Sequence, residues 1–377
     1  MSQREYALSG VDYTKLQGFK DMMAAAGQRT LDFPNKRGWF IKRTPHSHGG
    51  IYMYNGRDTL PYYLCNTQEG LGNKNWIAEW MYQFSGIDST FYDGIGIDTA
   101  RMAVNDLIAQ GALPIVYTDE VAGGDSDWFT DQRRSGDLAE SFFQACKDAG
   151  MALVAGESPA LKYLIKAEPP VKSAPSFSGC VTGVIQPHSR IITGEKLRVG
   201  DKILGVTSSG IHANGISLVI KRALILPDVF MTRLPNGNTL GEEALIPTMS
   251  YVALVEALLE ARIDIHALLP GTGDGVAKLS FDKRPYSYRV TNWLPDERIP
   301  ILFRFLRELG VSLMDCLTTF NWGIGYYIFI PASEVDRTIE IGTKAGYEIM
   351  EVGQIEEGQR QTIFGPAGDL VLPPPGE

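Results

Sequence analysis

Two runs of alternating strand-like and helix-like patterns constrain this chain more than any other feature of its sequence. In the first run, between residues 60 and 188, short apolar segments such as "LPIVYTDEV" alternate with longer stretches whose apolar residues recur every three or four positions. The second run begins at "KILGVT" and continues to an apolar segment near 347–355. Such alternation is typical of sheets covered by helices. We therefore expect an α/β (α+β) fold.

The length of the chain indicates more than one domain. A chain of 377 residues exceeds one ordinary core and suits two domains. The turn-rich segment "PHSRIITGEKLRVGD" separates the two runs, so we predict an N-terminal domain at residues 1–188 and a C-terminal domain at 189–377. A short helix is expected near residues 13–26, and the tail "LVLPPPGE" shows no obvious fold.

Charge and composition disfavour several kinds of partner. A net charge of −9 argues against binding to nucleic acid or to anionic membranes. The sequence contains no run of 18 apolar residues and no apolar core typical of a secretion signal. Its four cysteines are widely separated, which gives little support to a disulfide framework or a structural metal. We therefore expect a cytoplasmic protein without a nucleic-acid or membrane partner.

The segment at residues 94–112, "GIGIDTARMAVNDLIAQGA", combines an apolar helical stripe with polar residues. On a helix, Asp98 and Asn105 lie about 20° apart and about 10.5 Å apart along the axis, opposite the stripe. Asp98 or its neighbour Thr99 could cap the start of the helix. The pattern alone favours a capping Asp98 and solvated Asn105 and Asp106, but the same side chains could flank a long ligand.

Four turns combine glycine with acidic or amide side chains: "EGLGNK" (69–74), "GIDTARMAVND" (96–106), "AGES" (155–158) and "GTGDG" (271–275). Glycine lets backbone N–H groups approach phosphate, and carboxylates are the ligands that Mg²⁺ prefers. The four turns therefore indicate a nucleoside triphosphate site. The sequence lacks both the P-loop pattern and the dinucleotide fingerprint, which disfavours those two classes of enzyme.

Three motifs, in order, carry a resemblance to a known family: "GIDTARMAVNDLIAQGALPI", "GVTSSGIHANGISLV" and "TFNWGIGYYIFIP". The chain resembles the phosphoribosylformylglycinamidine cyclo-ligases, or aminoimidazole ribonucleotide synthetases, over nearly its whole length. The resemblance implies a homodimer whose N-terminal domains form a shared β-barrel, with ATP and Mg²⁺ as cofactors. It also implies ATP-dependent cyclisation of formylglycinamidine ribonucleotide to aminoimidazole ribonucleotide in purine biosynthesis.

The resemblance also suggests roles for the residues of these motifs and of the glycine turns. Catalysis is expected of Asp98, Glu157 and His212, and metal binding of Glu69, Asp98 and Glu157. Nucleotide contacts are expected of Glu69, Gly70, Gly72, Lys74, Asn105 and Asp106. Contacts with the small ribonucleotide substrate are expected of Ser208, Ser209, Asn214 and Thr272.

Some positions depart from the family pattern. The family's Asp-Gly-Val-Gly-Thr-Lys is "EGLGNK" here, and its Gly-Gly-Glu-Thr is "AGES". Its three glycines after threonine become Gly273-Asp274-Gly275, and the Glu-Asn pair that follows them is missing from "VAKLSF". Two alternatives therefore stay open: a diverged ATP-using paralogue with another substrate, and a non-catalytic dimeric nucleotide-binding module. Among the other histidines, His266 is expected in the core, within a strand formed by "IDIHAL" (263–268). His46 and His48 are expected to meet solvent or phosphate.

Overall fold

The computed structural model describes residues 60–375 continuously, together with 31–42, 53–56 and the single residues 22, 29, 44 and 46. The helix expected near 13–26 lies outside the described residues except at Met22, and His48 lies outside them as well. Within the described part of the chain, no helix is long and apolar enough to cross a membrane.

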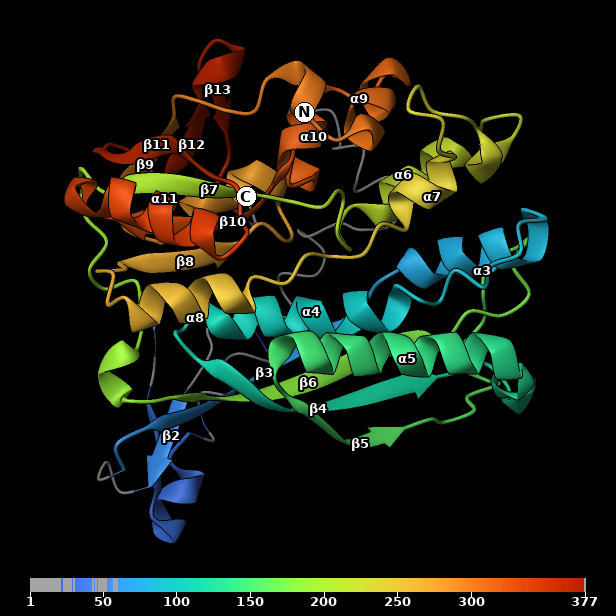
Figure 1. Ribbon diagram of the computed structural model, residues 1–377, viewed down its shortest axis with the longest axis horizontal. Helices are drawn as coiled ribbons and strands as arrows, with labels where there is room; N and C mark the ends of the chain where they lie inside the picture. Colours follow the sequence, from blue (N-terminus) through green and yellow to red (C-terminus); the bar gives the residue numbers. More distant parts are fainter. Residues whose placement is uncertain are drawn as a thin grey trace.

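The N-terminal domain is a sheet covered by helices on one face (Figure 1). Among the described residues the sheet has six strands in the order β1-β2-β3-β6-β4-β5. The strands are β1 (Trp39–Lys42), β2 (Met53–Gly56), β3 (Tyr63–Gly70), β4 (Leu113–Ala122), β5 (Ala152–Glu157) and β6 (Ser176–Ile185), and the helices are α3 (Lys74–Phe84), α4 (Ile95–Ile108) and α5 (Gln132–Ala149).

Alternation along β6 explains why only one face of this sheet is covered. Phe177, Val181 and Ile185 are buried in the core with α4, while Ser178 and Cys180 between them point to the other face and are only half-buried. Figure 1 shows α4 and α5 on the same side of the sheet. The edge strand β5 is exposed along its whole length. The sheet therefore presents an open face.

The C-terminal domain is built on a second sheet, in which the described strands follow the order β13-β12-β9-β11-β7-β10-β8. These strands are β7 (Lys202–Thr207), β8 (Ala267–Pro270), β9 (Tyr286–Val290), β10 (Ile324–Ile330), β11 (Ile349–Glu357), β12 (Gln361–Phe364) and β13 (Leu370–Leu372). Its helices are α6 (Ile216–Ala223), α7 (Leu240–Ala244), α8 (Val252–Glu260), α9 (Ile301–Glu308), α10 (Leu313–Thr319) and α11 (Val335–Lys344), with the 3-10 turn η6 (Gly275–Ser280).

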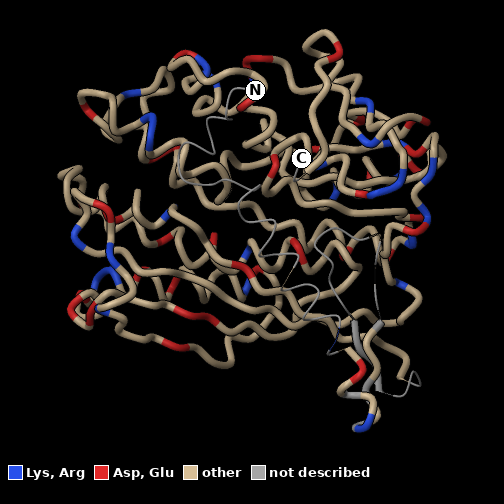
Figure 2. Tube along the Cα trace, turned by 180° about the vertical axis from the view of Figure 1, so that it is seen from behind, with Lys and Arg blue, Asp and Glu red and all other residues tan. Residues whose placement is uncertain are grey.

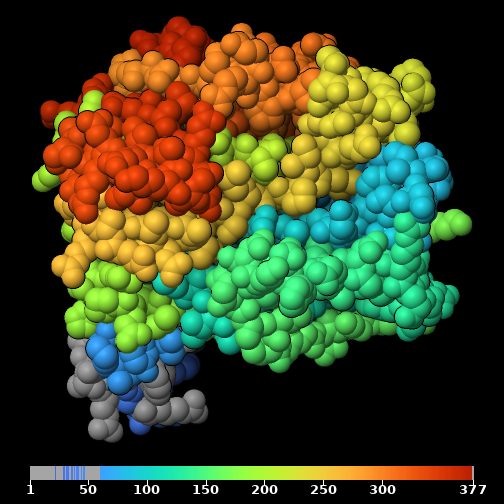
Figure 3. Space-filling view, in the orientation of Figure 1, coloured from blue at the N-terminus to red at the C-terminus, as the bar shows by residue number. Residues whose placement is uncertain are grey.

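Each of the two hydrophobic cores contains residues of both domains. Trp80 and Met81 of α3 belong to the core of the C-terminal domain, where Trp80 packs on Phe230 with ring centroids 5.2 Å apart. The apolar stripe of α4 belongs to a second core that also contains residues of α8, β7 and β10. Figure 3 shows the atoms of the two domains in contact along this boundary, and Figure 2 shows acidic and basic residues interspersed over both.

Three expectations about secondary structure are wrong. The helix α4 begins at Ile95, so Asp98 lies inside its first turn, and the N-cap residue Gly94 has no side-chain cap. The strand expected at 263–268 is β8 at Ala267–Pro270, after His266. The tail is not without fold, because Leu370–Leu372 pairs with β12 as β13. The predicted boundary after residue 188 lies between β6 and β7.

Candidate functional site

The polar face of α4 binds the backbone of the C-terminal domain. Asp98 and Arg101 are one helical turn apart and therefore lie on one face. The Asp98 carboxylate accepts hydrogen bonds from the backbone N–H, 2.8 Å away, and the hydroxyl of Thr248. The Arg101 guanidinium donates to the carbonyl oxygen of the same residue at 2.6 Å. Two side chains of one domain thus hold both backbone groups of Thr248.

Asn105 extends this contact by two further turns of the helix. Its amide nitrogen donates to the carbonyl oxygen of Met249 at 2.9 Å, and its amide oxygen accepts from the N–H of Tyr251 at 3.2 Å. Asp98 and Asn105 are 0% and 1% exposed, so neither is solvated. Considered as an isolated helix, α4 is expected to expose Asn105 to solvent. This expectation is wrong, because the segment before α8 covers this face of the helix.

Lys74 and Asp98 form an ion pair that is fully buried at the same boundary. The Lys74 Nζ lies 2.8 Å from the Asp98 Oδ2, and both side chains are 0% exposed. The ammonium also donates to the carbonyl oxygens of His212 at 2.8 Å and Ile246 at 2.7 Å. Burial lowers the pKa of Lys74 and raises that of Asp98, and the attraction between the charges opposes both shifts. The ammonium therefore lies within 2.8 Å of three protein oxygens, as many as it has protons.

Glycines bring the turns of the C-terminal domain into contact. A Cβ on Gly215 would lie 2.3 Å from the Phe320 ring, and one on Gly275 would lie 2.7 Å from the carbonyl oxygen of Phe320. A Cβ on Gly325 would lie 2.5 Å from the His212 Cε1. No other residue fits at such distances without movement. The loop 208–215, the turn 271–275 and the turn 319–325 therefore converge.

His212 lies at this convergence and is 1% exposed. Its backbone has a φ of 59°, and neither ring nitrogen has a hydrogen-bond partner among the described residues. Burial, with the nearby charges of Lys74 and Arg101, lowers the pKa of His212 to about 3. The imidazole is therefore neutral. The side-chain nitrogen of Asn214, two residues later, is also buried without a partner in the described part of the chain.

The two serines predicted to bind substrate donate to protein groups in this structure. Ser208 donates to the side-chain oxygen of Asn321 at 3.2 Å, and Ser209 donates to the carbonyl oxygen of Pro247 at 2.6 Å. Asn321 in turn donates to the carbonyl oxygen of Gly210 at 2.8 Å. These bonds fix the shape of the loop that carries His212.

Asp106 of α4 faces the turn that contains Thr272. Its Oδ1 is buried and has no hydrogen-bond partner among the described residues. Burial raises the pKa of Asp106, and the charge of Lys278 and the hydroxyl of Thr272 offset part of that rise. The predicted residues Asp106, Thr272, His212 and Asn214 thus all lie along the boundary between the domains.

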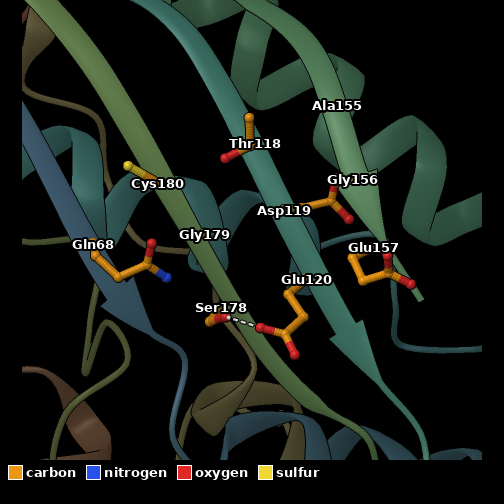
Figure 4. A pocket seen from close by; sticks show the side chains of 10 residues that line it. All are labelled: Gln68, Thr118, Asp119, Glu120, Ala155, Gly156, Glu157, Ser178, Gly179 and Cys180. Carbon is orange, nitrogen blue, oxygen red and sulfur yellow. Dashed lines mark hydrogen bonds between the residues drawn. The ribbon is translucent and has the colours of Figure 1, made fainter. Parts of the chain in front are cut away.

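Glu157 lies elsewhere, on the open face of the first sheet. It lines a hollow of about 330 Å³ between the ends of β3, β4, β5 and β6, together with Asp119 and Glu120 (Figure 4). Ser178 donates to the Glu120 carboxylate at 3.3 Å across this hollow, and burial raises the pKa of Asp119.

The predicted turn at 69–74 connects β3 to α3. Glu69 is half-buried at the end of β3, Gly70 follows it as the last residue of that strand, and Gly72 adopts a left-handed backbone with a φ of 75°. Lys74 is the first residue of α3. The turn therefore directs the chain from the first sheet to the buried ion pair.

The structure does not bring Glu69, Asp98 and Glu157 together as metal ligands. No group of three His, Cys, Asp or Glu side chains in the described part of the chain could hold a metal ion. Their metal-binding role stays a prediction. Sequence reasoning missed Arg101 and Lys278. The spacing of Arg101 three residues after Asp98 could have indicated the first of them, while nothing in the sequence pointed to Thr248.

Comparisons with known proteins place both domains in one family. Residues 72–185 match the model for "AIR synthase related protein, N-terminal domain", and residues 198–365 match the model for the C-terminal domain of the same proteins. A phosphoribosylformylglycinamidine cyclo-ligase of Pyrococcus horikoshii is 31% identical, covering 93% of this chain and 94% of the relative. That of Thermococcus gammatolerans is 32% identical, covering 96% and 98%.

Solved structures share the fold at lower identity. The crystal structure of the hydrogenase maturation protein HypE in complex with ATP superposes with a TM-score of 0.54 at 18% identity, covering 83% of this chain and 85% of that chain.

The buried ion pair gives a first prediction. Asp98→Asn should lower the free energy of unfolding by about 3–5 kcal/mol, because it leaves a buried ammonium without its counter-ion. Lys74→Met should be similarly costly, and the double variant should cost clearly less than the sum of the two. Urea unfolding measures all three. Glu340→Gln, in the exposed Lys344–Glu340 pair, serves as the control and should leave the free energy of unfolding unchanged. If the loss of unfolding free energy in the double variant equals the sum of the two single losses, the two charges do not stabilise each other.

Proposed function

The chain belongs to the AIR synthase related protein family, and on that premise we propose that it is an ATP-dependent ligase that cyclises formylglycinamidine ribonucleotide to aminoimidazole ribonucleotide in purine biosynthesis. The observation that carries the proposal is a row of buried polar groups that lack protein partners in the described part of the chain. These are both ring nitrogens of His212, the side-chain nitrogen of Asn214 and one carboxylate oxygen of Asp106, all at the convergence of the family motifs. Buried polar groups usually have partners, so these groups are available to a ligand.

The reaction needs positioning more than a strong acid or base. ATP transfers its γ-phosphoryl group to the formyl oxygen, releasing ADP, and the neighbouring amidine nitrogen then attacks that carbon and expels phosphate with loss of a proton. Such chemistry depends on orientation and on charge neutralisation. A neutral His212 offers one N–H donor and one acceptor to the substrate, and the Asp106 carboxylate can accept an N–H.

Mg²⁺ is the usual companion of ATP in such reactions and supplies charge neutralisation at the phosphates. The described residues of one chain do not form a site for it, because Asp98 is engaged by Lys74 and Glu157 lies on the open sheet face. A purine biosynthetic role fits a cytoplasmic location.

A second candidate function has one specific observation in its favour. The turn at 271–275 carries Asp274 in place of a glycine, and Lys278 follows it where the family's Glu-Asn pair is missing. A diverged ATP-using paralogue with another substrate would explain these changes near the substrate.

An activity assay tests the proposed reaction. With formylglycinamidine ribonucleotide present, the protein should release ADP from ATP, as a coupled assay detects. His212→Asn should lower the rate by about 100-fold or more, the lower end of what one positioned polar group contributes, because the shorter amide cannot replace the imidazole. Asn tolerates the left-handed backbone at this position, so the fold should persist. The exposed His188→Asn is the control. If the rate of ADP release does not depend on the ribonucleotide, the result favours the paralogue with another substrate.

We also propose that two chains form a homodimer through the open face of the first sheet. Leu153 and Val154 on the edge strand β5 are 47% and 57% exposed, and Ile115 on β4 is 40% exposed. An uncovered sheet face with an exposed edge is a surface that proteins usually pair or cover. Pairing with a second copy would bury these residues and would give the shared barrel that the family resemblance implies.

Sedimentation equilibrium tests the dimer. The protein should be dimeric at micromolar concentration, and Val154→Lys should shift it towards monomer because a charge would be buried at the interface. Val371→Lys changes a valine on β13, in the other domain, that is 49% exposed, and should leave the dimer intact. A wild-type monomer at these concentrations would contradict the proposed assembly.

A further inference from the structure

The turn between β8 and η6 carries a cation, Lys278, that forms no ion pair among the described residues. Lys278 is half-buried in η6, and its Nζ donates to the hydroxyl of Thr272 at 3.1 Å. Within the described part of the chain, this neutral hydroxyl is its one hydrogen-bond partner, and no carboxylate oxygen lies within 4.0 Å of the ammonium. A partly desolvated ammonium favours a nearby anion, so this charge is available to an anionic ligand.

The backbone of the same turn offers further donors. The N–H groups of Thr272 and Gly273 have no hydrogen-bond partner among the described residues. Gly273, Asp274 and Gly275 have consecutive φ values of 63°, 49° and 56°. A glycine turn of this kind can direct successive backbone N–H groups towards an anion. The donors and the ammonium belong to one short segment of seven residues, 272–278.

The position of this turn connects it to the candidate site. The N–H of Gly271 donates to the carbonyl oxygen of Gly325 at 2.9 Å, and Gly325 contacts the His212 ring. Asp106 of α4 lies close to the same turn, because the Lys278 charge and the Thr272 hydroxyl both lower its pKa. The negative charge of Asp106 opposes anion binding and limits its strength. A ligand here would reach the unpartnered groups of the candidate site.

We propose that Thr272, Gly273 and Lys278 form a subsite for a phosphoryl group. Lysine binds phosphate as a point charge, and backbone N–H groups add directed hydrogen bonds. The subsite adds a phosphate contact to the proposed function. It rests on that function only for the identity of the ligand. The phosphoryl group belongs either to ATP or to the ribonucleotide substrate.

Calorimetric binding of ATP and of ribose 5-phosphate tests the subsite without turnover. Lys278→Met keeps the length and apolar stem of the side chain but removes its charge. It should weaken binding of one of the two compounds by about 10- to 100-fold, as expected when a hydrogen bond to a charged group is lost. Weaker ribose 5-phosphate binding assigns the subsite to the substrate, and weaker ATP binding assigns it to the nucleotide. Lys278→Arg should retain most of the affinity.

Two further variants keep the test decisive. Lys283→Met removes an exposed lysine five residues away and should change neither affinity. Thr272→Val removes the hydroxyl without changing the charge, so it should weaken binding of the same compound by a smaller factor. It serves as the test variant if Lys278→Met fails to fold. If folded Lys278→Met binds both compounds with wild-type affinity, the proposed subsite is wrong. If Lys278→Met does not fold, wild-type affinity of Thr272→Val for both compounds contradicts the subsite instead. A failure of the proposed function would give a different result. The wild-type protein would then not turn over the ribonucleotide, but Lys278→Met would still weaken binding of the phosphate compound.

Discussion

The buried ion pair between Lys74 and Asp98 is the interaction on which the arrangement of the two domains depends. An isolated charge in the interior is so costly that the ammonium must be surrounded by oxygens. Those oxygens come from α4, from the carbonyl of His212 and from the carbonyl of Ile246. One side chain at the start of α3 thus fixes the helix of one domain and two loops of the other, including the loop that presents His212.

Apolar packing supports this polar contact. Apolar side chains of α3, including Trp80 and Met81, lie in the core of the C-terminal domain, and the stripe of α4 lies in a core shared with α8. The backbone of Thr248–Tyr251 is held between α4 and α8 by Asp98, Arg101 and Asn105. The family motifs therefore meet at the boundary because both cores extend across it. A ligand bound there would contact both domains at once.

The sequence alone predicts the local elements well and the long-range partners poorly. The stripe of α4 and the strand β7 follow from local periodicity, and so does the position of Asp98 and Asn105 on one side of α4. Their partners lie more than 140 residues away, in a segment without any motif, so the capping and solvated interpretations were wrong. The tail was missed because β13 is three residues long and gains its stability from pairing with β12. The convergence of His212 and Thr272 was suggested by the family resemblance rather than by local pattern.

Scanning calorimetry tests most directly whether the two domains form one structural unit. If the ion pair and the shared cores join them as described, the wild-type protein should unfold in a single transition that includes both sheets. Removing the amide contact with Asn105→Ala should lower the temperature of that transition without dividing it. Two separate transitions in the wild-type protein, one for each domain, would contradict the account.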